Sequence, residues 1–335
     1  MKEIKESNII YVLCPINLKT GGTELLHQLV SELNRKGKKA YICYDREQED
    51  FNVCEEFKKY INEYKILTEI DDVADNLIIV PETLTIRLNK FSKLQKSVWW
   101  MSVDNYFRHQ DVLFTLKHYG MKQASHLFVK KIIGREKHLT IRDLKEVPFH
   151  FVQSYYAHDY LGKLGFNTIF LSDYINEFFY GIDFRKLKKE NVIAYYPLKG
   201  YKITQKIIPE YSKAKWVPIV NMTNDQVRET LMKAKLYVDF GNFPGKDRIP
   251  REAALSYCCV LTGKFGASAY YEDLPIDDKY KFSEPLKHIS EIVRQIDYCI
   301  SEYDVAINEF DVYRNRILQE KKIFGEEIDR IFLTD

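Results

Sequence analysis

Residues 235–263 read KLYVDFGNFPGKDRIPREAALSYCCVLTG and predict the local fold around which the rest of the chain is organised. Apolar runs at Leu236–Phe240 and Val260–Thr262 have the length and composition of buried strands. Between them lie a basic loop with glycine and proline, Gly241–Arg248, and a short helix that carries Glu252. Such a β–loop–α–β unit directs loop amides and a helix N-terminus to one edge of a parallel sheet, where anionic ligands bind. The segment therefore predicts an α/β fold with a ligand site at this edge.

The loop and helix carry the cations Lys246, Arg248 and Arg251 and the carboxylate Glu252. The cations suit phosphate, because lysine supplies a point charge and arginine a bidentate fork. The carboxylate can accept hydrogen bonds from sugar hydroxyls. We therefore predict that the segment holds a phosphorylated nucleotide. A structural alternative exists for Glu252, since a carboxylate near a helix N-terminus is stabilised by about 0.3–1 kcal/mol through the helix dipole.

The same helix and strand resemble a sequence element of the GT-B glycosyltransferases. Glu252–Ala254 (EAA) and Cys259–Leu261 (CVL) are similar to the pattern EA(M/L)ACG-x-PV(I/V), especially as it occurs in the retaining family 4. The resemblance implies that Glu252 binds the ribose of a nucleotide-sugar donor. The family usually has a second glutamate eight residues earlier, where this chain has Pro244. This difference leaves the details of sugar binding and the stereochemistry of transfer open.

Strand-like and helix-like segments alternate through the rest of the chain, which is typical of a doubly wound parallel sheet. In the first half the predicted strands are Asn8–Leu13, Lys39–Tyr44, Asn76–Val80, Ser97–Val103 and Val147–Gln153. In the second half they are Asn191–Tyr196, Lys215–Val220, Leu236–Phe240 and Val260–Thr262. Helices are expected between them, for example from Gly21 until Gly37, from Pro81 to about Phe91, and over Asn224–Lys233.

The segment Tyr174–Glu190 predicts a domain boundary, because it ends in a run of charges and the alternation restarts after it. We expect an N-terminal domain over residues 1–178, a C-terminal domain over residues 179–305 and a last helical segment over residues 306–335. The resemblance implies an α/β GT-B fold, in which two Rossmann-like domains with doubly wound parallel sheets face each other across a cleft. It also implies that the first domain binds the acceptor, the second binds the donor, and the last helix returns to the first domain.

Two more candidates for donor binding lie in the predicted C-terminal domain. Lys199 follows its first strand and resembles the lysine–glycine element that contacts the donor diphosphate in the family. The alternative is a solvated loop lysine. Asn221 lies where relatives hold the nucleobase, and here the alternative is that Thr223 or Asn224 simply caps the following helix.

Two glycines, Gly21 and Gly22, separate the first strand of the N-terminal domain from its first helix. They resemble the glycine loop that lies beside the donor phosphate and the acceptor in the family. The alternative is that glycine is sterically required at a tight turn. Because the pattern is not G-x-G-x-x-G, a nicotinamide-dependent dehydrogenase is disfavoured.

Residues 99–105 (WWMSVDN) end at the same edge of the predicted N-terminal sheet. Together with residues 153–154, 171–174 and 245–254 they resemble glycosyltransferase-like proteins of capsule and surface-polysaccharide assembly. Asp104 is a candidate for binding the acceptor or, in an inverting enzyme, for the general base. His109 is the second candidate base. For both residues the alternative is an ordinary polar role in a loop.

Composition limits the partners and the location of the protein. A formal net charge of +2 over 335 residues argues against general nucleic-acid binding. No apolar run is long enough to span a bilayer and the N-terminus lacks a signal-peptide pattern, so a cytoplasmic protein is expected. The six cysteines show no C-x-x-C spacing, which indicates thiols rather than disulfides or a zinc site. The basic and apolar stretch Met121–His138 suits a peripheral contact with the inner face of the membrane, and a solvated amphipathic helix is the alternative.

These features predict a glycosyltransferase that moves a sugar from a nucleoside-diphosphate sugar to a glycan or lipid-linked acceptor in bacterial surface-polysaccharide biosynthesis, such as that of capsule or lipopolysaccharide. Because the chain has no D-x-D motif, no metal-chelated diphosphate is expected, and the donor needs no further cofactor. Two alternatives remain: a GT-B-like scaffold that binds nucleotide or glycan without turnover, and a nucleotide-sugar epimerase of the same fold. The donor sugar, its base, the acceptor and the oligomeric state are left open by the sequence.

Overall fold

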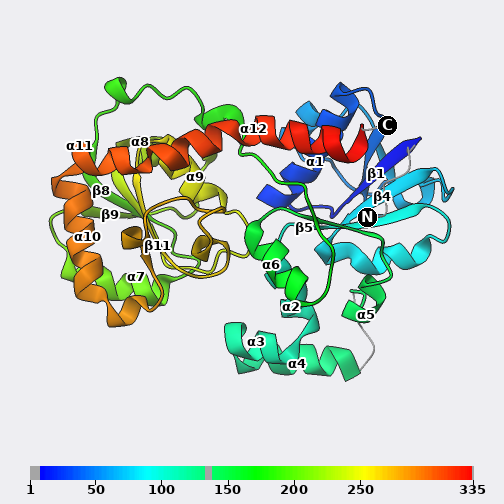
Figure 1. Ribbon diagram of the computed structural model, residues 1–335, viewed down its shortest axis with the longest axis horizontal. Coiled ribbons are helices and arrows are strands. Elements are labelled where there is room, and N and C mark those ends of the chain that lie inside the picture. The colour runs from blue at the N-terminus through cyan, green and yellow to red at the C-terminus, as the bar shows by residue number, and fades with distance from the viewer. Residues whose placement is uncertain (1–7, 133–137, 334–335) are drawn as a thin grey trace. The chain divides into compact units, whose positions relative to one another are not determined.

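The computed structural model describes residues 8–132 and 138–333, which form two compact units (Figure 1). Unit 1 comprises Met1–Asp173 together with Ile323–Asp335, and unit 2 comprises Tyr174–Lys322. The last helix, α12 (Asp311–Phe332), therefore contributes residues to both units.

In the described part of unit 1, seven strands form one sheet, and every pairing in it is parallel. The strands are β1 (Ile9–Cys14), β2 (Ala40–Tyr44), β3 (Tyr64–Ile66), β4 (Asn76–Pro81), β5 (Gln95–Trp100), β6 (Phe149–Val152) and β7 (Ile169–Phe170). Their order across the sheet is β3-β2-β1-β4-β5-β6-β7. The order reverses between β1 and β4, so the predicted doubly wound parallel sheet is confirmed.

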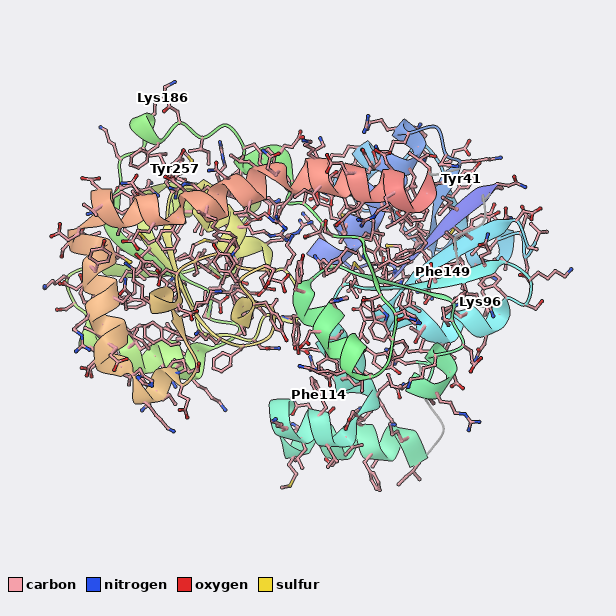
Figure 2. The ribbon with its side chains drawn as sticks, viewed as in Figure 1. Tyr41, Lys96, Phe114, Phe149, Lys186 and Tyr257 are labelled. Carbon is pink, nitrogen blue, oxygen red and sulfur yellow. The ribbon has the colours of Figure 1, made fainter. Side chains whose placement is uncertain are left out.

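The central strands of this sheet are buried because their side chains are nearly all apolar. β1 reads IIYVLC, and every residue after the first is buried. β5 carries Trp99 and Trp100, both fully buried. Tyr41 and Phe149, labelled in Figure 2, lie on β2 and β6 of the same sheet. The continuous apolar runs seen in the sequence thus become the core of unit 1.

Polar side chains cap several helices of unit 1. Thr20 caps α1 by accepting a hydrogen bond from the backbone N–H of Thr23, and Ser154 caps α6 by accepting one from the Ala157 N–H. The α-helices are α1 (Gly21–Arg35), α2 (Val103–Gln110), α3 (Val112–Tyr119), α4 (Met121–Ile132), α5 (Ile141–Leu144) and α6 (Tyr155–Lys163). The 3₁₀ helices are η1 (Glu55–Tyr60), η2 (Leu67–Glu69) and η3 (Glu82–Lys90).

The described part of unit 2 contains a second all-parallel sheet, of five strands in the order β12-β11-β10-β8-β9. The strands are β8 (Glu190–Tyr195), β9 (Lys215–Pro218), β10 (Ala234–Asp239), β11 (Cys259–Gly263) and β12 (Lys281–Phe282). The α-helices are α7 (Tyr201–Ile207), α8 (Asn224–Lys233), α9 (Arg248–Leu255), α10 (Ile289–Ser301), α11 (Tyr303–Ala306) and α12. The 3₁₀ helices are η4 (Glu177–Phe179), η5 (Phe184–Lys186), η6 (Ile208–Glu210), η7 (Ala267–Ala269), η8 (Asp278–Tyr280), η9 (Pro285–Lys287) and η10 (Ile307–Phe310).

Two predicted elements differ from the structure. The strand expected to reach Val103 ends at Trp100, because the hydroxyl of Ser102 accepts a hydrogen bond from the Asn105 N–H and starts α2 at Val103. The helix expected up to Phe91 is the 3₁₀ helix η3. The short strands β3, β7 and β12 were not predicted, since two or three residues carry no periodic signal.

The cysteines are all free thiols, five of them buried and Cys54 half-buried. Among the described residues, no helix combines the length and the apolar character that crossing a bilayer requires.

Candidate functional site

The candidate donor site lies where the strand order of unit 2 reverses. β8 pairs with β9 on one side and with β10 on the other. In open parallel sheets, ligands bind beyond the carboxyl ends of the strands at such a reversal. The segment 196–200 leaves β8 at this edge, and the segment 240–247 leaves β10 there. Both segments carry residues that the sequence predicts to bind a nucleotide.

A cluster of charged side chains joins these two segments. Lys199 forms an ion pair with Asp247, and its Nζ lies 5.0 Å from the ring centroid of Phe243. Asp239, at the end of β10, accepts hydrogen bonds from the Gly241 N–H at 2.8 Å and the Tyr237 hydroxyl at 3.1 Å. The predicted Lys199 thus has an acidic partner within the site loop and is no ordinary solvated lysine.

Burial and charge act in opposite directions within this cluster. Burial by itself lowers the pKa of Lys199, but the Asp247 and Asp239 carboxylates and the hydrogen bond to Asp247 raise it overall, so the ammonium form is favoured. Burial raises the pKa of Asp239 to about 6, against the opposing effect of Lys199. Burial also raises the pKa of Asp247, although Lys199 opposes this shift too. The cluster therefore holds one cation, Lys199, between two carboxyl groups whose pKa values burial raises.

Glycines allow the two segments to approach each other. Gly200 has φ 70°, and a Cβ atom there would lie 2.4 Å from the Gly241 nitrogen. A Cβ atom on Gly241 would lie 2.7 Å from Cγ of Lys199 and 2.9 Å from Oδ1 of Asp239. All three distances are shorter than real Cβ contacts, so glycine is needed at both positions. The glycines fix the place of Lys199 beside the β10 loop.

The predicted phosphate ligands Lys246 and Arg251 are paired with a carboxylate from α12. Glu320 accepts from Lys246 Nζ at 2.9 Å and from Arg251 Nη1 at 2.8 Å. Arg251 is 1% exposed and Glu320 is 4% exposed. Arg251 also donates to the backbone carbonyls of Lys246 at 2.9 Å and Asp247 at 3.2 Å. Both cations therefore anchor the loop, and their contact with a phosphate stays a prediction.

Arg248 and Glu252 lie on α9, which follows the loop. Arg248 is the first residue of this helix and Asp247 precedes it as the N-cap residue. Glu252 is half-buried and lies one turn further on, and the first turn of α9 contains no acidic residue. Attraction to the helix dipole therefore does not explain this carboxylate. Tyr237 has a strongly raised pKa, chiefly through burial, but with contributions from Asp239, Asp247 and Glu252, so Glu252 acts electrostatically on the same cluster.

Asn221 lies in the exposed turn after β9 and adopts φ 55°. The alternative expectation for this segment is confirmed in part, because Thr223 caps α8 and forms a capping box with Gln226. The role of Asn221 beside a nucleobase stays a prediction.

In unit 1, the strand order reverses between β1 and β4, and Gly21 and Gly22 form the first turn of α1 beside this point. A Cβ atom on Gly22 would make an ordinary contact of 3.6 Å with the Met101 side chain. Crowding by the protein therefore does not require glycine at position 22, and the predicted approach of a ligand remains a reason for it.

The two candidate bases lie on α2. Asp104 is 2% exposed and accepts a hydrogen bond from the Tyr156 hydroxyl at 2.6 Å. His109 is exposed, its Nδ1 lies 2.7 Å from the Asn105 carbonyl, and its ring stacks on His138 at 5.5 Å. Each residue thus has a structural partner, and a role in proton transfer stays a prediction for both.

Several polar residues at the two sheet edges were missed. Glu82 follows β4, is 2% exposed, and accepts from the Met101 N–H at 3.2 Å. Burial raises the pKa of Glu82 to about 7. Asp239 and Asp247 were missed in unit 2. The available signal was positional, because Glu82 and Asp239 each stand at the carboxyl end of a buried apolar strand.

Among the described residues, no group of three or more histidine, cysteine, aspartate or glutamate side chains is arranged to hold a metal ion.

No family model and no curated protein matches the sequence. Solved structures do match it in fold. A crystal structure of TarM has a TM-score of 0.67 at 10% identity, over 99% of this chain and 100% of that one. A second structure, an S. aureus TarM variant with fondaparinux, α-GlcNAc-glycerol and UDP, has a TM-score of 0.52 at 12% identity, and the match covers 80% of this chain but 57% of that one.

Two further proteins match over almost the full length of both chains. Sucrose-phosphate synthase from Thermosynechococcus elongatus has a TM-score of 0.63 at 12% identity, over 97% of this chain and 98% of that one. HepE from Anabaena in complex with UDP-glucose has a TM-score of 0.62 at 11% identity, over 96% of this chain and 98% of that one.

The first prediction concerns the buried ion cluster around Glu320. Glu320→Gln removes the buried carboxylate that pairs with Lys246 and Arg251, so the free energy of unfolding should fall by about 3–5 kcal/mol in urea titrations. The matched control is Lys321→Gln on the next residue of α12, whose exposed pair with Glu177 should contribute less than about 1 kcal/mol. Equal effects of the two substitutions would contradict the anchoring role of Glu320.

The second prediction is a pH dependence. The pKa of Asp239 is raised on folding from its usual 3.8 to about 6, so its contribution to stability is fully present below pH 4 and is lost as the pH rises through 6. The loss amounts to about 3 kcal/mol, at 1.36 kcal/mol per pKa unit. Between pH 4 and pH 7 the free energy of unfolding should therefore decline less in Asp239→Asn than in the wild type, because the contribution of Asp239 is absent. Parallel curves for the two proteins would mean that Asp239 ionises normally.

The chain is thus built as two Rossmann-like parallel-sheet domains, and the full-length structural matches show that it has the GT-B fold.

Proposed function

We propose that this chain is a metal-independent, cytoplasmic glycosyltransferase that moves a sugar from a uridine-diphosphate sugar to a glycan or lipid-linked acceptor in bacterial surface-polysaccharide biosynthesis. The observation that carries the proposal is the cluster of Lys199, Asp239 and Asp247 at the strand reversal of unit 2, within a GT-B fold. The choice of uridine is supported by HepE and the TarM variant, which were solved with UDP-glucose and UDP. Fondaparinux in the TarM variant supports a glycan acceptor.

In this proposal the donor binds to unit 2. Lys199 and Arg248 contact the diphosphate, and Glu252 accepts hydrogen bonds from the ribose hydroxyls. Lys246 and Arg251 contribute by holding the loop in place. Lys199 suits its role because its side chain is only partly exposed and is kept charged by its neighbours, so little reorganisation is needed when a phosphate arrives. Asn221 lies beside the base in the same proposal.

Chemistry at the donor depends on charge that develops on the departing diphosphate. Fixed cations and loop amides that face this charge stabilise the transition state, which is usually the largest contribution to such catalysis. The acceptor binds to unit 1 near Gly21, Gly22 and Asp104. In a retaining reaction the leaving phosphate itself takes the acceptor proton. In an inverting reaction Asp104 is the first candidate base and His109 the second. The burial of Asp104 and its bond from Tyr156 favour the retaining route.

The third prediction tests the donor site by binding. Removing one partner of a buried charged hydrogen bond costs ~2–5 kcal/mol, so the Kd of UDP should rise at least about 30-fold in Glu252→Ala, measured by isothermal titration calorimetry. The matched control is Glu210→Ala, which removes an exposed carboxylate of the same unit and should leave the Kd unchanged. If UDP does not bind the wild type, or binds both variants alike, the donor assignment fails.

Turnover separates the proposal from its two alternatives. Incubation with UDP-sugars and surface-polysaccharide precursors should release UDP and yield a glycosylated product, both visible by NMR. If the protein binds UDP but releases none from a UDP-sugar, the result would support the scaffold. Pro244, which replaces the family glutamate, is the sequence feature that favours this alternative. Formation of an isomeric UDP-sugar without any acceptor would support the epimerase.

A peripheral contact with an anionic membrane is a further part of the proposal. The helices α3 and α4 pack against each other, and six of their large apolar side chains are exposed. These are Leu113, Leu116, Met121, Phe128, Val129 and Ile132. Phe114 of α3, labelled in Figure 2, instead packs on Phe107 of α2 and the core of unit 1, so the hairpin is anchored on one side.

The charge of this hairpin points to anionic lipid. Residues 112–132 contain Lys117, Lys122, Lys130 and Lys131 and no acidic residue. Exposed apolar side chains flanked by lysines are the pattern of helices that lie in the interface of an anionic bilayer. Arg135 and Lys137, which the sequence adds to this basic stretch, lie outside the described residues.

The fourth prediction is that the wild type co-sediments with phosphatidylglycerol vesicles at low salt, and much less with phosphatidylcholine vesicles. The double substitution Met121→Ser and Phe128→Ser should reduce sedimentation at least fivefold, because it removes apolar area from the interface. The control pair Leu286→Ser and Val312→Ser removes exposed apolar side chains from unit 2 and should have no effect. Equal sedimentation of all three proteins would contradict the membrane contact.

A further inference from the structure

A cavity of about 340 Å³ lies within unit 1, beyond the carboxyl ends of β1 and β2. Its size falls within the ~300–1,000 Å³ of small-molecule sites. One wall is the loop from Cys14 to Lys19, which leads directly into Gly21 and Gly22. The remaining lining residues are His27, Tyr44, Phe51, Asn52, Val53, Cys54 and Phe57. The proposed donor residues of unit 2 have no part in this cavity.

Buried rings form the inner part of the cavity. His27, Tyr44 and Phe57 are each at most 4% exposed, and the rings of His27 and Phe57 lie 4.5 Å apart. The Thr23 carbonyl lies 2.7 Å from Nδ1 of His27, and since a carbonyl only accepts, Nδ1 carries the proton. The Tyr44 hydroxyl then donates to Nε2 of His27 at 2.8 Å.

This arrangement makes the inner surface uncharged. Burial lowers the pKa of His27, despite the opposing effect of the Thr23 carbonyl and of Glu24, so the imidazole is neutral near pH 7. Burial likewise raises the pKa of Tyr44 above its usual value, so its hydroxyl stays protonated. The two side chains satisfy each other, and the cavity presents mainly ring and apolar surface to an occupant.

The rim of the cavity is polar and carries no net charge. Asn17 and Asn52 are exposed and offer amide groups, and Phe51 is half-exposed with its ring 4.9 Å from that of Tyr44. Lys19 on one side pairs with Glu56 of η1 on the other. Because this pair cancels its own charge, the rim has no excess cation for a phosphate.

A pyranose ring matches this combination of surfaces. Its C–H face packs on aromatic rings while its hydroxyl groups, at the ring edge, need hydrogen-bond partners. We propose that the cavity binds a neutral sugar unit of the acceptor glycan, with the aromatic side chains beneath the ring and Asn17 and Asn52 at its hydroxyl edge. That this sugar belongs to an acceptor rests on the proposed function. The inference adds that the acceptor is a neutral saccharide rather than a phosphorylated or acidic one.

Saturation-transfer NMR tests the proposal on the full chain. The probes are methyl glycosides of glucose, galactose, N-acetylglucosamine and rhamnose, each at millimolar concentration, with UDP titrated separately. We expect at least one glycoside to receive saturation from the wild type. Phe51→Ala and Asn52→Ala should each weaken that glycoside at least fivefold, and Tyr271→Ala, which removes an exposed ring of unit 2, should not. The Kd of UDP should be the same in all four proteins.

Each outcome has one meaning. Asn52 is exposed, so its substitution tests the rim even if Phe51→Ala proves unstable by circular dichroism. The inference would be overturned if no glycoside binds the wild type. It would also be overturned if a glycoside binds both cavity variants as tightly as it binds the wild type. Displacement of the glycoside by UDP would identify the cavity as a nucleotide site and overturn it too. If UDP fails to bind but a glycoside binds in the cavity, the donor proposal fails and the sugar site stands.

Discussion

The ion cluster around Glu320 is the constraint on which the candidate donor site depends. Glu320 comes from α12 and holds Arg251 and Lys246, which belong to the loop after β10 and the helix that follows. Arg251 in turn holds the carbonyls of Lys246 and Asp247, so the loop is fixed from within the protein. Asp247 can then pair with Lys199 on the neighbouring segment. Isolated buried charges are costly, so each member of this chain of contacts requires the next.

The same contacts keep Lys199 charged and fix its position in the site. Burial raises the pKa of Asp239 and of Asp247, and their carboxylates in turn raise the pKa of Lys199, so Lys199 stays cationic. The glycines at positions 200 and 241 bring Lys199 against the β10 loop. A partly shielded ammonium group interacts with phosphate more strongly than a fully solvated one, because water screens the interaction less.

The sequence predicted most of the framework and part of the site. Long apolar runs such as Leu236–Phe240 were found within two residues of their true bounds, and Asn224–Lys233 was found without error, because its N-cap is explicit. Lys199 and Glu252 were predicted through resemblance, and their contact with a donor stays a prediction. Glu320 could not be found, since it lies 69 residues from Arg251 and only tertiary packing joins them. The cavity of unit 1 was missed for the same reason, because its aromatic lining comes from separate segments.

The most direct test of the account asks whether Lys199 binds the diphosphate of the donor. The measurement is the Kd of uridine and of UDP for the wild type and for Lys199→Met, by calorimetry at one salt concentration. The account predicts that UDP binds the wild type much more tightly than uridine does, and that Lys199→Met removes most of this difference while the affinity for uridine is unchanged. A variant that keeps the full preference for UDP over uridine would contradict it.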